Sequence, residues 1–274
     1  MTEFKNATIL ITGAAGGFGQ ELTRQLLAAG GRLILSDRDE TLLRQRVETI
    51  QNEVKSGDII ACFGADLSDQ QGCEILGDRI KSLNIPIDIL INNAGLGLFG
   101  RSDEVPAEKW ETLMQVNLLA PLRLTNQFLP DMIARKQGHI VNISSVAGWS
   151  GRAGLAHYCA SKFGLRGFSE SLFDEVKPYN VKVTAVYPFF SRTPILKSEK
   201  YGTLADSLKD LPDGWLTDPA EVMKATLKGI RYNKLHVFPD RTGNLIHLAK
   251  RYAPSLLDRI SVLANNIIVD RDKK

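Results

Sequence analysis

Short apolar runs alternate with longer amphipathic stretches along most of the 274 residues of this chain. The runs are rich in β-branched residues and are apolar at consecutive rather than alternate positions. This pattern is typical of strands that are covered by helices on both faces. The expected strands are Ala7–Ile11, Arg32–Ser36, Asp58–Phe63, Ile87–Ile91, His139–Ile143, Val181–Tyr187 and Leu235–Phe238.

The stretches between these strands have the spacing of helices. Phe18, Leu22 and Leu26 fall on one face of the first stretch, and the second begins after Asp39, which can serve as its N-cap. Strands that alternate with helices form βαβ units with right-handed crossovers. We therefore expect an α/β fold with a doubly wound parallel sheet of about seven strands, flanked by helices.

The pattern loosens after residue 188. Residues 189–214 show little periodicity and contain the turn formers Pro194, Gly202, Pro212 and Gly214. Such a stretch in a compact domain is usually a functional lid or a disordered loop. Helical spacing returns over residues 245–252 and again over residues 256–263, after Pro254.

These changes predict the organisation of the chain. Residues 1–241 are expected to form a single domain, within which residues 189–216 form a loop beside the functional site. Residues 242–274 are expected to form a C-terminal helical extension. We find no internal repeat and no low-complexity segment, which favours one domain over two.

Composition and charge exclude several classes of protein. Hydrophobic residues make up 43% of the chain and charged residues 24%, so it is neither disordered nor a collagen-like or disulfide scaffold. The net charge of +3 is small and scattered, so no nucleic-acid partner is expected. The N-terminus, with Glu3 and only a short apolar run, does not resemble a signal peptide, and no transmembrane segment is expected. Cys62, Cys73 and Cys159 are odd in number and lack metal-ligand spacing, which predicts no metal site and suits the reducing cytoplasm.

A glycine-rich turn follows the first expected strand and leads directly into a helix. It reads Thr12-Gly13-Ala14-Ala15-Gly16-Gly17-Phe18-Gly19. Glycines let the backbone turn tightly and let a pyrophosphate approach the amide groups, while the helix N-terminus offers free N–H donors. A glycine cluster alone is often only a loop, but the strand–turn–helix context is the one that dinucleotide binding requires.

The second expected strand ends in Asp37 and Arg38. A carboxylate at this point can accept both hydroxyls of the adenosine ribose and repels a 2′-phosphate, which favours NAD(H) over NADP(H). Arg38 could instead attract that phosphate. The alternative interpretation of Asp37 is a helix N-cap.

Three further segments carry the remaining chemistry. Asn92-Asn93-Ala94-Gly95 follows the fourth strand, Ser144-Ser145 follows the fifth, and Tyr158-Cys159-Ala160-Ser161-Lys162 lies on the next helix. Together with the glycine turn, over residues 5–240, the chain resembles the short single-domain branch of the short-chain dehydrogenase/reductase family. The resemblance implies a Rossmann-type fold and an NAD(P)-dependent oxidoreductase.

The catalytic set also makes chemical sense from the residues themselves. Tyr158 and Lys162 are four positions apart and share one face of a helix. A phenol has a pKa near 10, and a nearby ammonium is expected to lower it, so that Tyr158 exchanges a proton with the reacting oxygen. Ser145 has the spacing from Tyr158 that the family uses for its serine, and its hydroxyl would polarise the carbonyl. Ser144 is one position too early, although sequence alone does not exclude it.

The resemblance implies that Asn117 is the fourth catalytic residue. Pro121 lies four positions later and has no N–H, so the Asn117 carbonyl loses its helical partner and the helix is expected to bend. Our hypothesis is that the freed carbonyl holds a water that links Lys162 to solvent. The alternative is that Pro121 only separates two helices.

The resemblance also implies a wider set of cofactor contacts. Asp66 would contact the adenine, and Thr193, five residues after Pro188, would bind the nicotinamide amide group. The chain departs from the family pattern at Phe189, where the family commonly has glycine. The expected cofactor-binding residues are Gly13, Gly17, Phe18, Gly19, Asp37, Arg38, Asp66, Leu67, Asn93, Ala94, Gly95, Tyr158, Lys162, Pro188 and Thr193.

The substrate is expected to be a small hydrophobic alcohol, secondary or primary, or its ketone or aldehyde. The candidate pocket residues are Trp149, Leu155, Phe189, Phe190 and the loop 191–215, although Phe189 and Phe190 could equally be core. Arg152 and Arg192 could address an anionic group. The apolar face of the C-terminal helices could cover the mouth of the active site or a subunit partner, or the helices could lie on a membrane surface; packing is favoured over the membrane. The resemblance implies a homodimer or homotetramer built on the helices of Asn117 and Tyr158.

Other functions fit less well. A catalytically silent NAD(P)-binding sensor would be expected to lose Tyr158 or Lys162, and both are present. A sugar-nucleotide epimerase or dehydratase of the longer branch needs a larger substrate domain. A membrane-surface interaction protein would leave the catalytic set unexplained.

Overall fold

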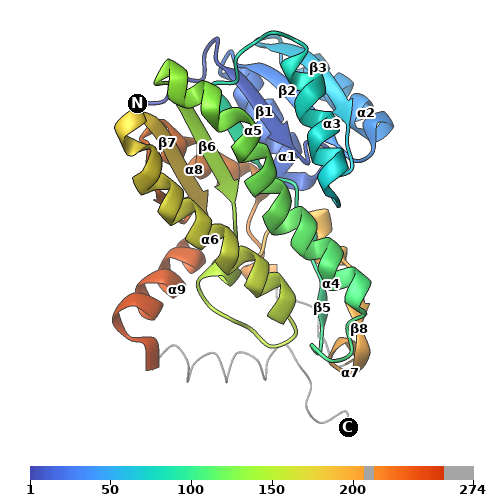
Figure 1. Ribbon diagram of the computed structural model, residues 1–274. Coiled ribbons are helices and arrows are strands. Elements are labelled where there is room, and N and C mark those ends of the chain that lie inside the picture. Colours follow the sequence, from blue (N-terminus) through green and yellow to red (C-terminus); the bar gives the residue numbers. More distant parts are fainter. Residues whose placement is uncertain (207–212, 256–274) are drawn as a thin grey trace.

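A seven-stranded, entirely parallel sheet forms the centre of the molecule in the computed structural model, which describes residues 1–206 and 213–255 (Figure 1). Its strand order is β3-β2-β1-β4-β6-β7-β9. The strands are β1 (Thr8–Thr12), β2 (Arg32–Asp37), β3 (Asp58–Gly64), β4 (Ile89–Asn92), β6 (Gly138–Ile143), β7 (Val181–Val186) and β9 (His236–Val237). All seven strands expected from the apolar runs are therefore confirmed, with ends that shift by one or two residues.

Two layers of helices cover the sheet. Leu22 and Leu26 of α1, Val47 of α2 and Met223 of α8 share one apolar core, and Leu76 of α3 belongs to the core on the other face, with α5 and α6. In Figure 1 the second group, α3, α5 and α6, lies in front of the sheet. The helices are α1 (Gly17–Ala28), α2 (Glu40–Glu53), α3 (Gln70–Lys81), α5 (Ala120–Arg135), α6 (Ala156–Val176) and α8 (Pro219–Arg231).

The sheet order creates a crevice where dinucleotides bind in folds of this kind. The chain runs outward through β1, β2 and β3 and then returns to place β4 on the other side of β1. The segments after β1 and β4 therefore leave the sheet in opposite directions and open a crevice at their carboxyl ends. The glycine turn follows β1, and Asn93-Ala94-Gly95 follows β4, so the topology brings these two motifs together.

The helix that carries Asn117 contains a π-helical turn. The segments α4 (Ala107–Met114), the π turn (Gln115–Leu119) and α5 follow one another without a break, and the Ala120 N–H donates to the Gln115 carbonyl five residues earlier. The bend expected near Pro121 thus takes the form of a wider turn. The alternative that Pro121 separates two helices is wrong.

Residues 189–214 contain short elements where they are described, so the alternative of a disordered loop is wrong for those residues. They include a 3-10 turn (Pro194–Lys197), β8 (Lys200–Tyr201) and the short helix α7 (Gly202–Asp206). The strand β8 pairs in parallel with β5 (Phe99–Gly100), which lies about a hundred residues earlier. This small second sheet and α7 lie beyond the carboxyl edge of the main sheet, beside α4 (Figure 1).

The expected C-terminal extension begins with α9 (Arg241–Tyr252). Asp240 caps this helix, and its two carboxylate oxygens accept from the Gly243 N–H (2.6 Å) and from the Phe189 N–H (2.8 Å). The His247 ring of α9 packs 4.4 Å from the Trp149 ring. The first tail helix therefore contacts the domain through His247, but Leu245, Leu248 and Tyr252, from its predicted apolar face, are exposed, so the favoured packing of that face is not seen. The second helix, expected over residues 256–263, lies outside the described residues.

None of the helices in the part of the chain that the structure describes has the length and hydropathy needed to cross a bilayer. Within the same residues, no cluster of His, Cys, Asp and Glu side chains has the arrangement of a metal site.

Candidate active site

A cavity of about 1600 Å³ opens at the carboxyl edge of the sheet. It begins beside β2 and β3, where Asp37 and Asp66 line it, crosses the glycine turn, and ends beside the segment 189–198. Fifteen of the expected site residues line it: Gly13, Gly17, Phe18, Asp37, Arg38, Asp66, Leu67, Asn93, Ala94, Gly95, Ser145, Tyr158, Lys162, Pro188 and Thr193. Asn117 and Gly19 do not line it.

The glycine turn is shaped by close backbone approach. Gly13 has φ +65°, and a Cβ on it would lie 2.7 Å from the Ala94 Cα. A Cβ on Gly19 would collide with the Gly13 carbonyl oxygen, and one on Gly17 would lie 2.7 Å from Thr193 Cγ2. Side chains at these positions would fill the cradle, whereas glycine leaves the amide groups at the start of α1 accessible. The turn therefore fits a pyrophosphate.

The segment after β4 is tied to this turn. The Asn93 side-chain amide donates to the carbonyls of Thr12 (2.9 Å) and Gly13 (3.0 Å), and the Ala94 N–H donates to the Thr12 hydroxyl (3.1 Å). These bonds hold the two motifs against each other at the crevice. Asn93 and Ala94 thus support the floor of the cavity.

Asp37 connects the turn to the end of β2. Its carboxylate Oδ2 accepts from the Ala15 N–H at 2.9 Å, whereas Asp39, not Asp37, caps α2 by accepting from the Leu42 N–H. The N-cap interpretation of Asp37 is therefore wrong. Arg38 is exposed beside it and also lines the cavity.

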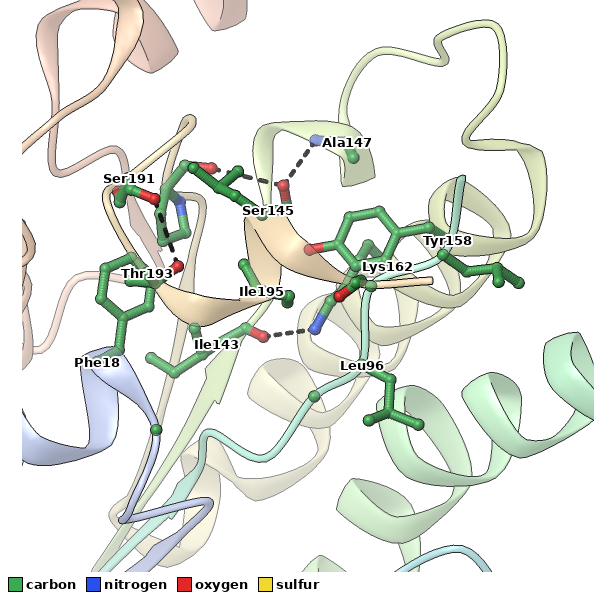
Figure 2. A pocket seen from close by; sticks show the side chains of 18 of the residues that line it. Phe18, Leu96, Ile143, Ser145, Ala147, Tyr158, Lys162, Ser191, Thr193 and Ile195 are labelled. Carbon is green, nitrogen blue, oxygen red and sulfur yellow. Dashed lines mark hydrogen bonds between the residues drawn. The ribbon is translucent and has the colours of Figure 1, made fainter. Parts of the chain in front are cut away.

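Tyr158 and Lys162 face the cavity from one side of α6 (Figure 2). Lys162 is only 4% exposed, and its ammonium donates to the Ile143 carbonyl at 3.0 Å, at the end of β6. Its Nζ lies 5.7 Å from the centre of the Tyr158 ring. Burial lowers the pKa of Lys162 to about 8, so the side chain is mostly protonated at neutral pH.

The expectation that Lys162 lowers the pKa of Tyr158 is not met in this arrangement. Burial raises the pKa of Tyr158 to about 12, and the hydrogen bond with Ser145 offsets only part of this rise. The physical reason is that desolvation penalises the phenolate, while the ammonium is directed to the Ile143 carbonyl instead of to the phenol oxygen. The phenol is therefore fully protonated at neutral pH.

The two adjacent serines have different surroundings. The Ser144 hydroxyl is buried and donates to the Lys162 carbonyl at 3.0 Å, inside α6. The Ser145 hydroxyl accepts from the Ala147 N–H at 3.1 Å and lies toward the Tyr158 oxygen (Figure 2). Ser145 is thus the serine that a reacting carbonyl would meet beside Tyr158.

Asn117 is fully buried, and its side chain supports the site without lining the cavity. Its Oδ1 accepts from the Leu96 N–H (2.7 Å), and its Nδ2 donates to the Leu96 carbonyl (2.9 Å) and to the Ser161 hydroxyl (3.3 Å). These bonds connect the π turn to the segment after β4 and to α6. The sequence carried no signal for Leu96, because a backbone partner has no side-chain motif.

The far end of the cavity is mainly apolar. Leu155, Phe189 and Phe190 line it as expected, but Trp149 does not. The Trp149 ring packs instead against Tyr187, Phe238 and His247, in the aromatic cluster under α9. The further lining residues that the sequence did not single out include Leu96, Leu98, Phe99, Val116 and Ile246.

The segment with Thr193 lies over the start of α1. Figure 2 shows Thr193 beside the Phe18 ring, and Thr193 is the closest contact that a side chain at Gly17 would meet. Phe189, in place of the usual glycine, is held through its N–H by Asp240. Asp240 could have been found as a helix N-cap, but its second bond joins residues 51 positions apart and left no local signal.

Comparison with known proteins yields close matches. The profile described as short chain dehydrogenase matches residues 7–202. Human (Homo sapiens) epidermal retinol dehydrogenase 2 is 33% identical over 97% of this chain and 86% of its own length. A short-chain dehydrogenase from Sphingobium yanoikuyae, solved in complex with NADPH, has 28% identity and a TM-score of 0.77 over 94% of this chain and 96% of its own. The bulky-bulky ketone specific alcohol dehydrogenase from Comamonas testosteroni has 27% identity and a TM-score of 0.74 over 94% of each chain.

Proposed function

Because this chain belongs to the short-chain dehydrogenase family, we propose that it interconverts a hydrophobic alcohol and its ketone or aldehyde, with a nicotinamide dinucleotide as hydride carrier. The observation that carries the proposal is the convergence of Tyr158, Ser145 and Lys162 on one wall of a mainly apolar cavity. The same cavity continues over the glycine turn, so the hydride carrier and the substrate would share it.

The protein supplies the proton and the orientation. A nicotinamide held over the glycine turn would supply or take up the hydride. Tyr158, protonated at neutral pH, donates the proton on its Oη to the carbonyl oxygen in the reductive direction. The Ser145 hydroxyl donates a hydrogen bond to the same oxygen, and the Lys162 ammonium, whose Nζ lies 5.7 Å from the centre of the Tyr158 ring, adds a positive charge to this wall of the cavity.

The Asp37 carboxylate supports a preference for NAD(H) over NADP(H). One of its oxygens is held by the Ala15 N–H, which leaves the other free to accept a ribose hydroxyl and places a negative charge where a 2′-phosphate would lie. The exposed Arg38 acts in the opposite sense. The preference therefore depends on which of the two neighbours is nearer the ribose.

Two features of the chain bear on its compartment and its assembly. The three cysteines are buried free thiols, which supports a reducing compartment such as the cytoplasm. Phe163 is 41% exposed on α6, which supports a homodimer or homotetramer built on the helices of Tyr158 and Asn117. Size-exclusion chromatography with light scattering tests this assembly.

The decisive experiment follows NADH and NADPH oxidation across a panel of ketones, aldehydes and 3-oxoacyl thioesters. Activity that is lost in Tyr158→Phe, with cofactor binding retained, supports the mechanism. Full activity of Tyr158→Phe would refute the role given to this phenol. A wild-type protein that binds the cofactor but oxidises it with no carbonyl would favour a silent sensor.

A further inference from the structure

The charges that line the cavity are divided between its two ends. Its acidic residues lie at the end expected to hold the adenosine, where Asp37 ends β2, Asp66 follows β3, and Arg38 is the one positive lining residue among those described. At the other end the charged lining residues are Arg152, Lys162 and Lys200. Within the described residues, the apolar substrate end thus contains only positive charge, which favours an anionic group on the molecule that enters it.

Arg152 is one of the charges at this end to which the proposed mechanism gives no role, and it is the one that lies against the aromatic wall. It lies in the loop before α6 and is half-buried, and burial lowers its pKa. Among the described residues, no carboxylate lies within ion-pairing distance of its guanidinium, which instead lies 5.6 Å from the centre of the Phe190 ring. Other arginines of the chain do have carboxylate partners, such as Arg135 with Asp88 and Arg166 with Glu170.

A guanidinium without an anionic partner in an apolar wall costs free energy of desolvation, and an anionic ligand would offset this cost. Its planar set of N–H donors matches the two oxygens of a carboxylate or the oxygens of a phosphate. The guanidinium lies over the ring of Phe190, and this cation–π contact favours the position that it has in the wall. Arg192, the other candidate from the sequence, is exposed and does not line the cavity.

We propose that Arg152 binds an oxyanion of the substrate, so that the natural substrate is an amphipathic carbonyl compound with an apolar body and a carboxylate or phosphate at one end. This inference rests on the proposed function and names its substrate class. The carbonyl reacts beside Tyr158 and Ser145, the body lies along the apolar walls, and the anionic end lies against Arg152.

The test compares three series of medium-chain ketones that end in a carboxylate, a phosphate monoester or a methyl ester. The wild-type protein is expected to prefer one of the anionic series, and which one identifies the oxyanion. Arg152→Gln is expected to lower kcat/KM for that series by about 10- to 100-fold, the usual effect of losing one charge-assisted hydrogen bond. The variant is expected to raise KM for the anionic series, with little change in kcat. Its kinetics with the methyl esters are expected to equal those of wild type.

Two further variants serve as controls. Arg152→Lys keeps the charge but loses the planar set of N–H donors. Its kcat/KM for the anionic series is expected to lie between those of wild type and Arg152→Gln. Arg192→Gln removes an exposed charge that does not line the cavity and is expected to change kcat/KM for neither the anionic nor the ester series. Quenching of protein fluorescence by NADH, measured in parallel, is expected to give the same cofactor affinity in all four proteins.

Several results would overturn the inference. An equal loss for anionic and ester substrates would make Arg152 a packing residue, and a loss of cofactor affinity would assign it to the cofactor. A wild-type preference for the methyl esters would exclude an anionic substrate while leaving the oxidoreductase intact. A wild-type protein that reduces none of the ketones with NADH or NADPH would refute the proposed function itself.

Discussion

Ser144 and Ser145 follow one another at the end of β6, yet their hydroxyl groups have different partners. Ser144 donates into α6 at the Lys162 carbonyl, whereas Ser145 lies beside the phenol of Tyr158. Nothing in the chemistry of the two side chains distinguishes them. The distinction comes from the strand geometry, in which successive residues point to opposite faces.

The serine pair supplies the first prediction. Ser145→Ala removes a donor to the developing oxyanion and is expected to lower kcat by about 10²- to 10³-fold. Ser144→Ala is expected to cost about 1 kcal/mol of unfolding free energy, because it removes a buried hydrogen bond, with a much smaller effect on kcat. Steady-state kinetics and urea unfolding of both variants measure the two effects; a larger kcat loss in Ser144→Ala would reverse the assignment.

Asp37 supplies the second prediction. Asp37→Asn keeps an oxygen that can accept from the Ala15 N–H but removes the negative charge. The ratio of kcat/KM for NADH to that for NADPH is expected to fall by about tenfold, since repulsion of a 2′-phosphate by one charge at close range is of order 1–4 kcal/mol. Arg38→Gln, the neighbouring control, is expected to move the ratio in the opposite direction. An unchanged ratio in both variants would place the determinant elsewhere.

At the scale of elements, one continuous helix extends from the site to the face of the sheet that α5 covers. It runs from α4 through the π turn into α5, and the π turn brings Asn117 to the Leu96 backbone and to Ser161 of α6. A regular α-helix would pair its carbonyls four residues ahead, and Pro121 removes the partner of Asn117. At the π turn, therefore, the backbone carbonyl of Asn117 can accept a hydrogen bond from outside the helix.

Pro121→Ala tests this helix. If the Asn117 carbonyl holds a water that connects Lys162 to solvent, restoring the N–H at position 121 is expected to slow turnover by about tenfold, with little change in cofactor affinity. Pro130→Ala is the matched control, because Pro130 lies inside α5 on its exposed side and removes a helical N–H in the same way. Equal turnover in the two variants and in wild type would refute the proton path.

At the scale of the whole molecule, the two edges of the sheet have different roles. The carboxyl edge carries the cavity, the small β5–β8 sheet, α7 and α9. The amino edge carries a polar network around His139, whose ring nitrogens lie 2.9 Å from the Thr2 hydroxyl and 2.8 Å from the Thr184 hydroxyl. This network ties the N-terminus to β6 and β7 and contains no candidate site residue.

His139 gives the molecule a defined sensitivity to acid. Burial lowers its pKa from 6.5 to about 3, so the unfolded chain binds a proton between these values and the folded protein does not. Stability from this residue is complete above pH 6.5 and is lost as the pH falls toward 3, by up to about 1.4 kcal/mol per pH unit. Between pH 6 and pH 4, the free energy of unfolding of His139→Gln, measured in urea, is expected to change less steeply with pH than that of wild type, by this amount. Above pH 7.5 the difference in unfolding free energy between the two proteins is expected to be constant. Equal slopes would contradict this account.

The sequence by itself determined the framework of the protein. Buried parallel strands need apolar residues at every position, and their covering helices need an apolar stripe, so periodicity alone predicted all seven strands of the main sheet. The glycine turn, Asn93, Ser145, Tyr158 and Lys162 were found because each belongs to a short segment whose spacing survives without the fold. These are local properties, and a linear chain displays them directly.

Only the tertiary structure decided what depends on residues far apart in the chain. The pKa of Tyr158 rises because elements from several parts of the sequence exclude water from it. Strands β5 and β8 have two residues each, too few for any pattern, and they form because two distant loops meet. Trp149 packs under α9 and Arg152 faces the cavity, although three positions separate them. Burial, and the direction in which loop side chains point, depend on contacts between residues that are far apart in the chain. The substrate end of the site was therefore decided by the tertiary structure.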